Sequence, residues 1–95
     1  MDRAALVLIV EDDPVIADVV ARTLHHAGHE TLLATTGQAA LAVLGERRPD
    51  LVLLDIGLPG DDGFTVQALI AARWPELSVV FLTARDSVDD KVRGL

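Results

Sequence analysis

The chain has no cysteine among its 95 residues, and aromatic side chains make up only 3% of it. The lack of cysteine excludes disulfide scaffolds and zinc sites that use cysteine ligands. The scarcity of aromatic residues means that any core must be aliphatic. Hydrophobic residues still account for 51% of the chain, which is ample for a core and excludes a disordered tail. A chain of this length is expected to form one domain, spanning residues 1–95.

Basic residues and long apolar runs are also scarce. The chain has 8 lysines and arginines against 15 acidic residues, which gives a formal net charge of −7. Such an acidic surface repels phosphate backbones and anionic lipids, which argues against direct binding to nucleic acid or to a membrane surface. No apolar run approaches the roughly 20 residues that span a bilayer, and the N-terminus shows no cleavage signature. These features predict a soluble, cytoplasmic domain.

Short apolar runs alternate with helical patterns along the chain. The runs are too short for helices and rich in β-branched residues, which is typical of strands that are buried on both faces. Each run is followed by a segment with helical spacing. This alternation predicts an α/β fold, a doubly wound parallel sheet with helices on both faces. The expected strands cover residues 6–10, 30–34, 51–54 and 79–82.

Local signals also indicate where the helices begin and which side chains they bury. Asp13 before Pro14 predicts the start of the first helix, because aspartate caps helices and proline suits the first helical position. Gly28 is placed where a C-terminal cap belongs. In the third helix, Leu69 and Ile70 are expected to face the core.

Acidic and hydroxyl side chains stand where the apolar strands end. Glu11 and Asp12 follow the first strand, Asp55 ends the third, and Thr83 ends the fourth. The carboxyl ends of parallel strands share one edge of the sheet, where ligands bind. Carboxylates that crowd together repel one another, and a hard divalent cation with oxygen ligands, such as Mg²⁺, relieves the repulsion. The pattern predicts a Mg²⁺-dependent phosphoryl site with Asp55 as nucleophile and Thr83 as a donor to phosphoryl oxygen.

Motifs surround these strand ends. Residues 10–14 read Val-Glu-Asp-Asp-Pro, and in residues 54–63 Asp55 is followed by Leu-Pro and then by Asp-Gly. Residues 82–84 read Leu-Thr-Ala. In this order the three segments resemble the acidic loop, the phosphoacceptor loop and the switch segment of the receiver domain of two-component response regulators, which has a flavodoxin-like fold. Residues 86–95 resemble the opening of the fourth helix in its transcription-factor branch, so that the resemblance covers the whole chain.

The resemblance implies a role for each residue at these strand ends. Asp55 would accept a phosphoryl group from a histidine of a sensor histidine kinase. Asp12 and Asp55 would ligate Mg²⁺ together with the backbone carbonyl of Gly57, and Glu11 would act through a metal-bound water. Thr83 would hydrogen-bond the phosphoryl group and move inward on activation. The implied function is that of a phosphoprotein in phosphorelay signal transduction, a switch rather than an enzyme.

The sequence departs from the family after its fourth strand. It stops at Leu95, inside the fourth helix, whereas the family continues into a fifth strand and a fifth helix. That strand ends on a lysine which pairs with the phosphoryl group, and Lys91, the only lysine here, lies mid-helix instead. We therefore expect a receiver domain that is C-terminally truncated, with strand order 2-1-3-4. Its fourth strand becomes an apolar edge, which predicts self-association through that strand.

Two other functions compete with phosphoryl transfer. A pseudo-receiver keeps the fold as a protein-interaction module and is not productively phosphorylated. The missing family lysine favours this alternative, and the acidic residues oppose it. Phosphatases of the haloacid-dehalogenase type carry a second aspartate two residues after the nucleophile, and Gly57 at that position disfavours them.

Three further side chains have simpler expected roles. Asp13 is predicted to be a helix N-cap rather than a metal ligand, because Pro14 follows it. His25 and His29 lie at the end of the first helix and just after it. A favourable interaction with the helix dipole is expected there, rather than a surface metal pair.

Overall fold

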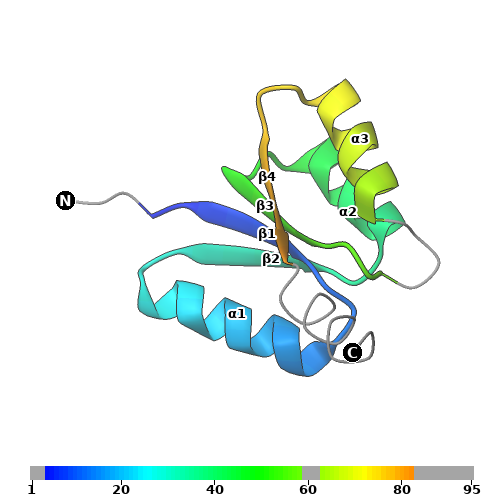
Figure 1. Cartoon of the computed structure of the whole chain (residues 1–95). Helices are drawn as coiled ribbons and strands as arrows, with labels where there is room; N and C mark the ends of the chain where they lie inside the picture. The colour runs from blue at the N-terminus through cyan, green and yellow to red at the C-terminus, as the bar shows by residue number, and fades with distance from the viewer. Residues whose placement is uncertain (1–3, 59–62, 83–95) are drawn as a thin grey trace.

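The computed structural model describes residues 4–58 and 63–82. Within these ranges the chain forms one sheet of four parallel strands in the order β2-β1-β3-β4 (Figure 1). This confirms the predicted doubly wound α/β fold and its strand order, while the helix expected at residues 86–95 lies outside the described residues. In chain order the elements are β1 (Leu6–Val10), α1 (Pro14–His26), β2 (Glu30–Ala34), α2 (Gly37–Glu46), β3 (Leu51–Asp55), α3 (Gly63–Arg73) and β4 (Ser78–Leu82).

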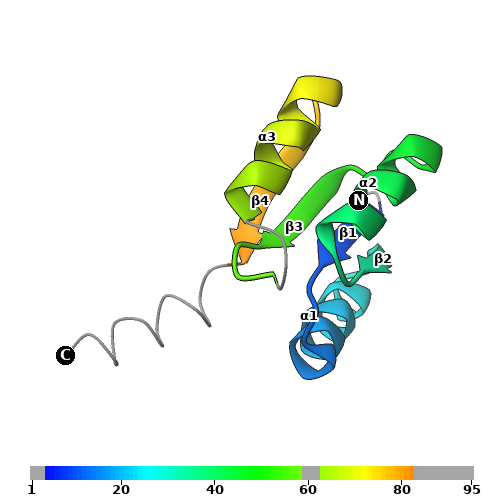
Figure 2. The ribbon, with the colours of Figure 1, turned by 90° about the vertical axis from the view of Figure 1, so that its right-hand side faces the viewer.

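Helices cover the sheet on both faces. α1 packs on one face, against β1 and β2, while α2 and α3 pack next to each other on the opposite face (Figure 2). The main core lies between the sheet and these two helices, and its fully buried side chains include Leu8, Leu54 and Ile70. Trp74 and Phe81 are partly buried at its margin. The core is therefore almost wholly aliphatic, as the composition predicts. In the described part of the chain, no helix has the length and apolar character needed to cross a membrane.

The two ends of α1 follow the signals in the sequence. Asp13 is the N-cap, and its side chain accepts hydrogen bonds from the N–H groups of Val15 and Ile16. Pro14 occupies the first helical position, where its missing N–H leaves no helical bond unmade. Beyond the other end, Gly28 has a φ of 89°, a left-handed conformation that glycine adopts without strain. Both predicted boundaries are confirmed.

The prediction that Leu69 faces the core is wrong. Leu69 is 44% exposed, whereas the adjacent Ile70 is fully buried. The buried positions of α3 are Gly63, Val66 and Ile70, whose spacing places them on one face of the helix. Neighbouring residues in a helix are about 100° apart around its axis, so Leu69 lies beside this face and not on it.

The face of the sheet that carries α1 is only partly covered by the described residues. Leu33, Ile9, Leu53 and Val80 hold matching register positions on the four adjacent strands, from β2 to β4. Ile9 is 1% exposed, but Leu33 and Val80 at the two ends of this row are 54% and 50% exposed. β4 is therefore an apolar edge strand among the described residues.

Candidate metal centre

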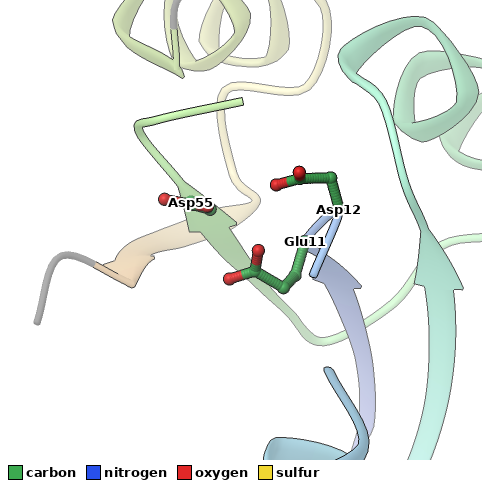
Figure 3. A group of neighbouring side chains, drawn as sticks. All are labelled: Glu11, Asp12 and Asp55. Carbon is green, nitrogen blue, oxygen red and sulfur yellow. The ribbon is translucent and has the colours of Figure 1, made fainter. Parts of the chain in front are cut away.

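Acidic side chains from two adjacent strands meet at the carboxyl edge of the sheet. β1 and β3 are hydrogen-bonded neighbours, with Val10 in register with Leu54. Glu11 therefore follows β1 at the level where Asp55 ends β3. Glu11, Asp12 and Asp55 each offer one carboxylate oxygen, and these three atoms lie within 4.8 Å of one another (Figure 3). The structure thus brings together the acidic residues that the sequence predicted at this edge.

Glu11 is held through both its backbone and its side chain. Its backbone N–H donates to the carbonyl of Ala34 at 3.0 Å, which extends the pairing of β1 with β2 one residue beyond the strand. Its Oε2 accepts a hydrogen bond from the N–H of Asp13, also at 3.0 Å. The residue is only 2% exposed. These contacts fix a buried carboxylate beside the end of β3.

Asp55 is oriented by the turn that follows it. The residue is 1% exposed, and its Oδ1 accepts a hydrogen bond from the N–H of Gly57 at 3.0 Å. A side chain that bonds to the backbone two residues later forms an Asx turn, which holds the carboxylate in one orientation. The family resemblance implies a role for the carbonyl of Gly57, and the structure adds this contact from its N–H. The Asp-x-Gly spacing, which is typical of such turns, is the signal that points to it.

Asp12 and Asp13 are neighbours in sequence but have different surroundings. Asp12 is half-buried and joins the cluster with Glu11. The carboxylate of Asp13 lies at the start of α1, where its Oδ1 is 2.9 Å from the backbone nitrogen of Val15 and 3.3 Å from that of Ile16. Asp13 therefore caps the helix, as predicted.

The cluster suits a hard divalent cation. All three groups are carboxylates, and Glu11 and Asp55 are buried. Burial strengthens the repulsion between like charges, because less water screens them. A doubly charged ion that prefers oxygen ligands relieves this repulsion, and Mg²⁺ typically takes one or two protein carboxylates and keeps several waters. The residues present therefore fit magnesium.

The two predicted histidines lie at the end of α1 that is farther from the cluster. Thr83, the expected hydroxyl donor, is outside the described residues. At the C-terminal end of α1, Nε2 of His25 lies 3.0 Å from Oγ1 of Thr31. Nδ1 of His29 accepts a hydrogen bond from the N–H of Ala5 at 2.9 Å. These bonds tie the two rings to β2 and to the residue before β1, which favours a structural role for both histidines.

The sequence of the chain matches a known protein family. A sequence profile of the response regulator receiver domain matches residues 7–95. The chain belongs to the response regulator receiver domain family. The matched region includes Glu11, Asp12 and Asp55, and the resemblance that the motifs suggested is confirmed.

Two relatives of this receiver domain are bacterial regulatory proteins. The chain is 39% identical over 89 residues to the probable transcriptional regulatory protein TcrX of Mycobacterium tuberculosis, a match that covers 94% of this chain and 38% of TcrX. It is also 39% identical over 92 residues to the response regulator protein FleR of Pseudomonas aeruginosa, which covers 97% of this chain and 20% of FleR. The receiver domain thus spans well under half the length of these relatives.

A solved structure has the same fold. The response regulator protein TrrA of Thermotoga maritima, in complex with Mg²⁺-BeF, matches this receiver domain with a TM-score of 0.81 at 32% identity. The match covers 84% of this chain and 70% of that one. The similarity supports the four-stranded receiver fold described above.

Proposed function

We propose that the receiver domain accepts a phosphoryl group on Asp55 from a phosphohistidine of a sensor histidine kinase, in a Mg²⁺-dependent reaction. The observation that carries this proposal is the set of three carboxylate oxygens within 4.8 Å, in a chain of the receiver family. The complex of the related TrrA with Mg²⁺-BeF supports it. The proposed role is a cytoplasmic signalling switch, in which the chain is the phosphoacceptor rather than an enzyme.

Each residue of the cluster has a distinct task in this reaction. A carboxylate oxygen of Asp55 forms a bond to phosphorus while the P–N bond of the phosphohistidine breaks, and the bonding electrons stay on the imidazole nitrogen. Asp12 and Asp55 would hold Mg²⁺ together with the carbonyl of Gly57. Glu11 would act through a water bound to the ion. When bound, Mg²⁺ offsets the negative charge of the carboxylates and of the incoming phosphoryl group. Thr83 donates a hydrogen bond to phosphoryl oxygen.

Beryllofluoride, which mimics a phosphoryl group on a carboxylate, tests this proposal without a kinase. We expect the amide NMR signals of Asp55 and Gly57 to shift when beryllofluoride and Mg²⁺ are added together. With EDTA present to remove Mg²⁺, beryllofluoride should not shift these signals. A response to Mg²⁺ alone, with none to beryllofluoride, would contradict the proposal and support a pseudo-receiver. Steady hydrolysis of a small phosphate ester would instead indicate a phosphatase.

We also propose that the domain self-associates through β4. Among the described residues β4 pairs with β3 alone, so its other edge has no neighbouring strand there. The strand contains neither a charged residue nor a proline, the two features that commonly protect exposed edges from pairing. Val80, in the middle of the strand, is 50% exposed. A second copy of the chain is the partner that this edge fits, because the same unprotected strand is present on both.

A charge on β4 tests this association. Val80→Lys is expected to shift the sedimentation equilibrium towards monomer, because an edge lysine must lose its hydration when another strand pairs beside it. The matched control is Val19→Lys on α1, where the native valine is 58% exposed, and it should associate like the parent chain. A parent chain that stays monomeric at every concentration would disprove the association.

A further inference from the structure

We infer that Gly63 is a positioning residue for Asp55: its lack of a side chain allows the start of α3 to lie directly against the backbone that leaves β3. Asp55 is oriented by the N–H of Gly57, so the path of residues 55–57 determines where the carboxylate lies. The effect on Mg²⁺ binding rests on the proposed function, whereas the effect on the position of Asp55 rests on backbone geometry.

The contact at Gly63 is too close for any side chain. A Cβ atom built on this residue would lie 2.3 Å from Cα of Ile56 and 3.0 Å from the carbonyl oxygen of Asp55. Gly63 is buried, and its N–H donates to the carbonyl of Ile56 at 3.2 Å. Carbon atoms in van der Waals contact need about 3.5–4.0 Å, so a methyl group here cannot be accommodated without movement.

The atoms that a methyl group would meet belong to the backbone, so no side-chain rotation can relieve the contact. Either α3 must move or the backbone of residues 55–57 must. α3 is held by Val66 and Ile70, which are 3% and 0% exposed in the core. The displacement therefore falls on residues 55–57, and with them on the carboxylate that lies within 4.8 Å of its partners in the cluster.

Close approach, and not an unusual backbone angle, is what requires glycine here. Gly28 is the glycine with a positive φ in the described part of the chain, and a Cβ on it would meet nothing within 4 Å. Gly63 has no positive φ, but a Cβ on it would meet the backbone of Asp55 and Ile56. Gly45, near the end of α2, also has open space around its Cα and serves as a matched control.

The test compares Gly63→Ala with Gly45→Ala and with Ile70→Ala. Gly63→Ala is expected to shift the amide signal of Gly57 and to weaken Mg²⁺ binding at least about tenfold, the usual cost of disturbing groups that support metal ligands. Gly45→Ala should keep the affinity of the parent chain. Ile70→Ala should lower the melting temperature but keep the Mg²⁺ affinity well below that temperature. If Gly63→Ala lowers only the melting temperature, Gly63 merely stabilises the fold and the inference is overturned.

Two further results separate this inference from the proposed function. If the parent chain does not bind Mg²⁺, the proposed function fails, and the Gly57 amide signal in metal-free Gly63→Ala still decides the role of Gly63. If Gly63→Ala does not fold, amide hydrogen exchange in the parent chain decides: the N–H groups of Gly57 and Gly63 should slow together when Mg²⁺ is added. Slowing at Gly57 with no change at Gly63 would overturn the inference.

Discussion

Asp55→Asn is expected to abolish phosphorylation of the receiver domain and to leave its fold intact. Asparagine has nearly the shape of aspartate. In the structure, the N–H of Gly57 donates a hydrogen bond to Asp55 at 3.0 Å, and the side-chain oxygen of asparagine can still accept it. The amide is a much poorer nucleophile than the carboxylate and cannot form an acyl phosphate. Intact-protein mass spectrometry after incubation with a phosphorylated histidine kinase and Mg²⁺ would detect the added phosphoryl group.

Asp13→Asn is the matched control for this experiment. It makes the same chemical change in the acidic loop after β1, at a side chain that caps α1 instead of joining the cluster. Asparagine is also a good N-cap, so the helix should be unaffected. Asp13→Asn is therefore expected to be phosphorylated like the parent chain. Phosphorylation of Asp55→Asn at the parent level would show that the acceptor lies elsewhere.

Ile70→Ala is expected to destabilise the domain severely, whereas Leu69→Ala is not. Ile70 is fully buried in the core under α3, so the shorter side chain leaves a cavity and costs about 2–5 kcal/mol of unfolding free energy. Small domains have a total stability of only about 5–15 kcal/mol, so this loss is a large share of it. Leu69 is 44% exposed, and its truncation should cost less than about 1 kcal/mol.

Urea unfolding followed by circular dichroism measures both variants. The two substitutions affect adjacent residues of one helix and introduce the same residue, so helix propensity contributes similarly to each. The difference between them therefore reports burial against the core. Equal losses of stability would contradict the assignment of Ile70 to the buried face of α3 and of Leu69 to its side.

Local sequence signals are sufficient for much of this fold because they act over a few residues. Asp13 and Pro14 begin α1 because a carboxylate next to free N–H groups and a fixed φ favour a helix start in any context. Apolar β-branched runs form strands, and a strand that ends on Asp55 places that residue at the carboxyl edge of the sheet. The order of the strands required the family resemblance, since the pattern alone does not say which strands are neighbours.

The sequence by itself thus determined the elements, their succession and the acidic character of one sheet edge. Only the tertiary structure decided that Glu11 and Asp55 are both buried there, each with a carboxylate oxygen within 4.8 Å of the other and of one from Asp12. It also decided that Ile70 packs in the core while Leu69 does not, and that Gly63 touches the backbone of Ile56. These features depend on how β1, β3 and α3 pack against one another, and contacts between segments far apart in sequence have no signal within either segment.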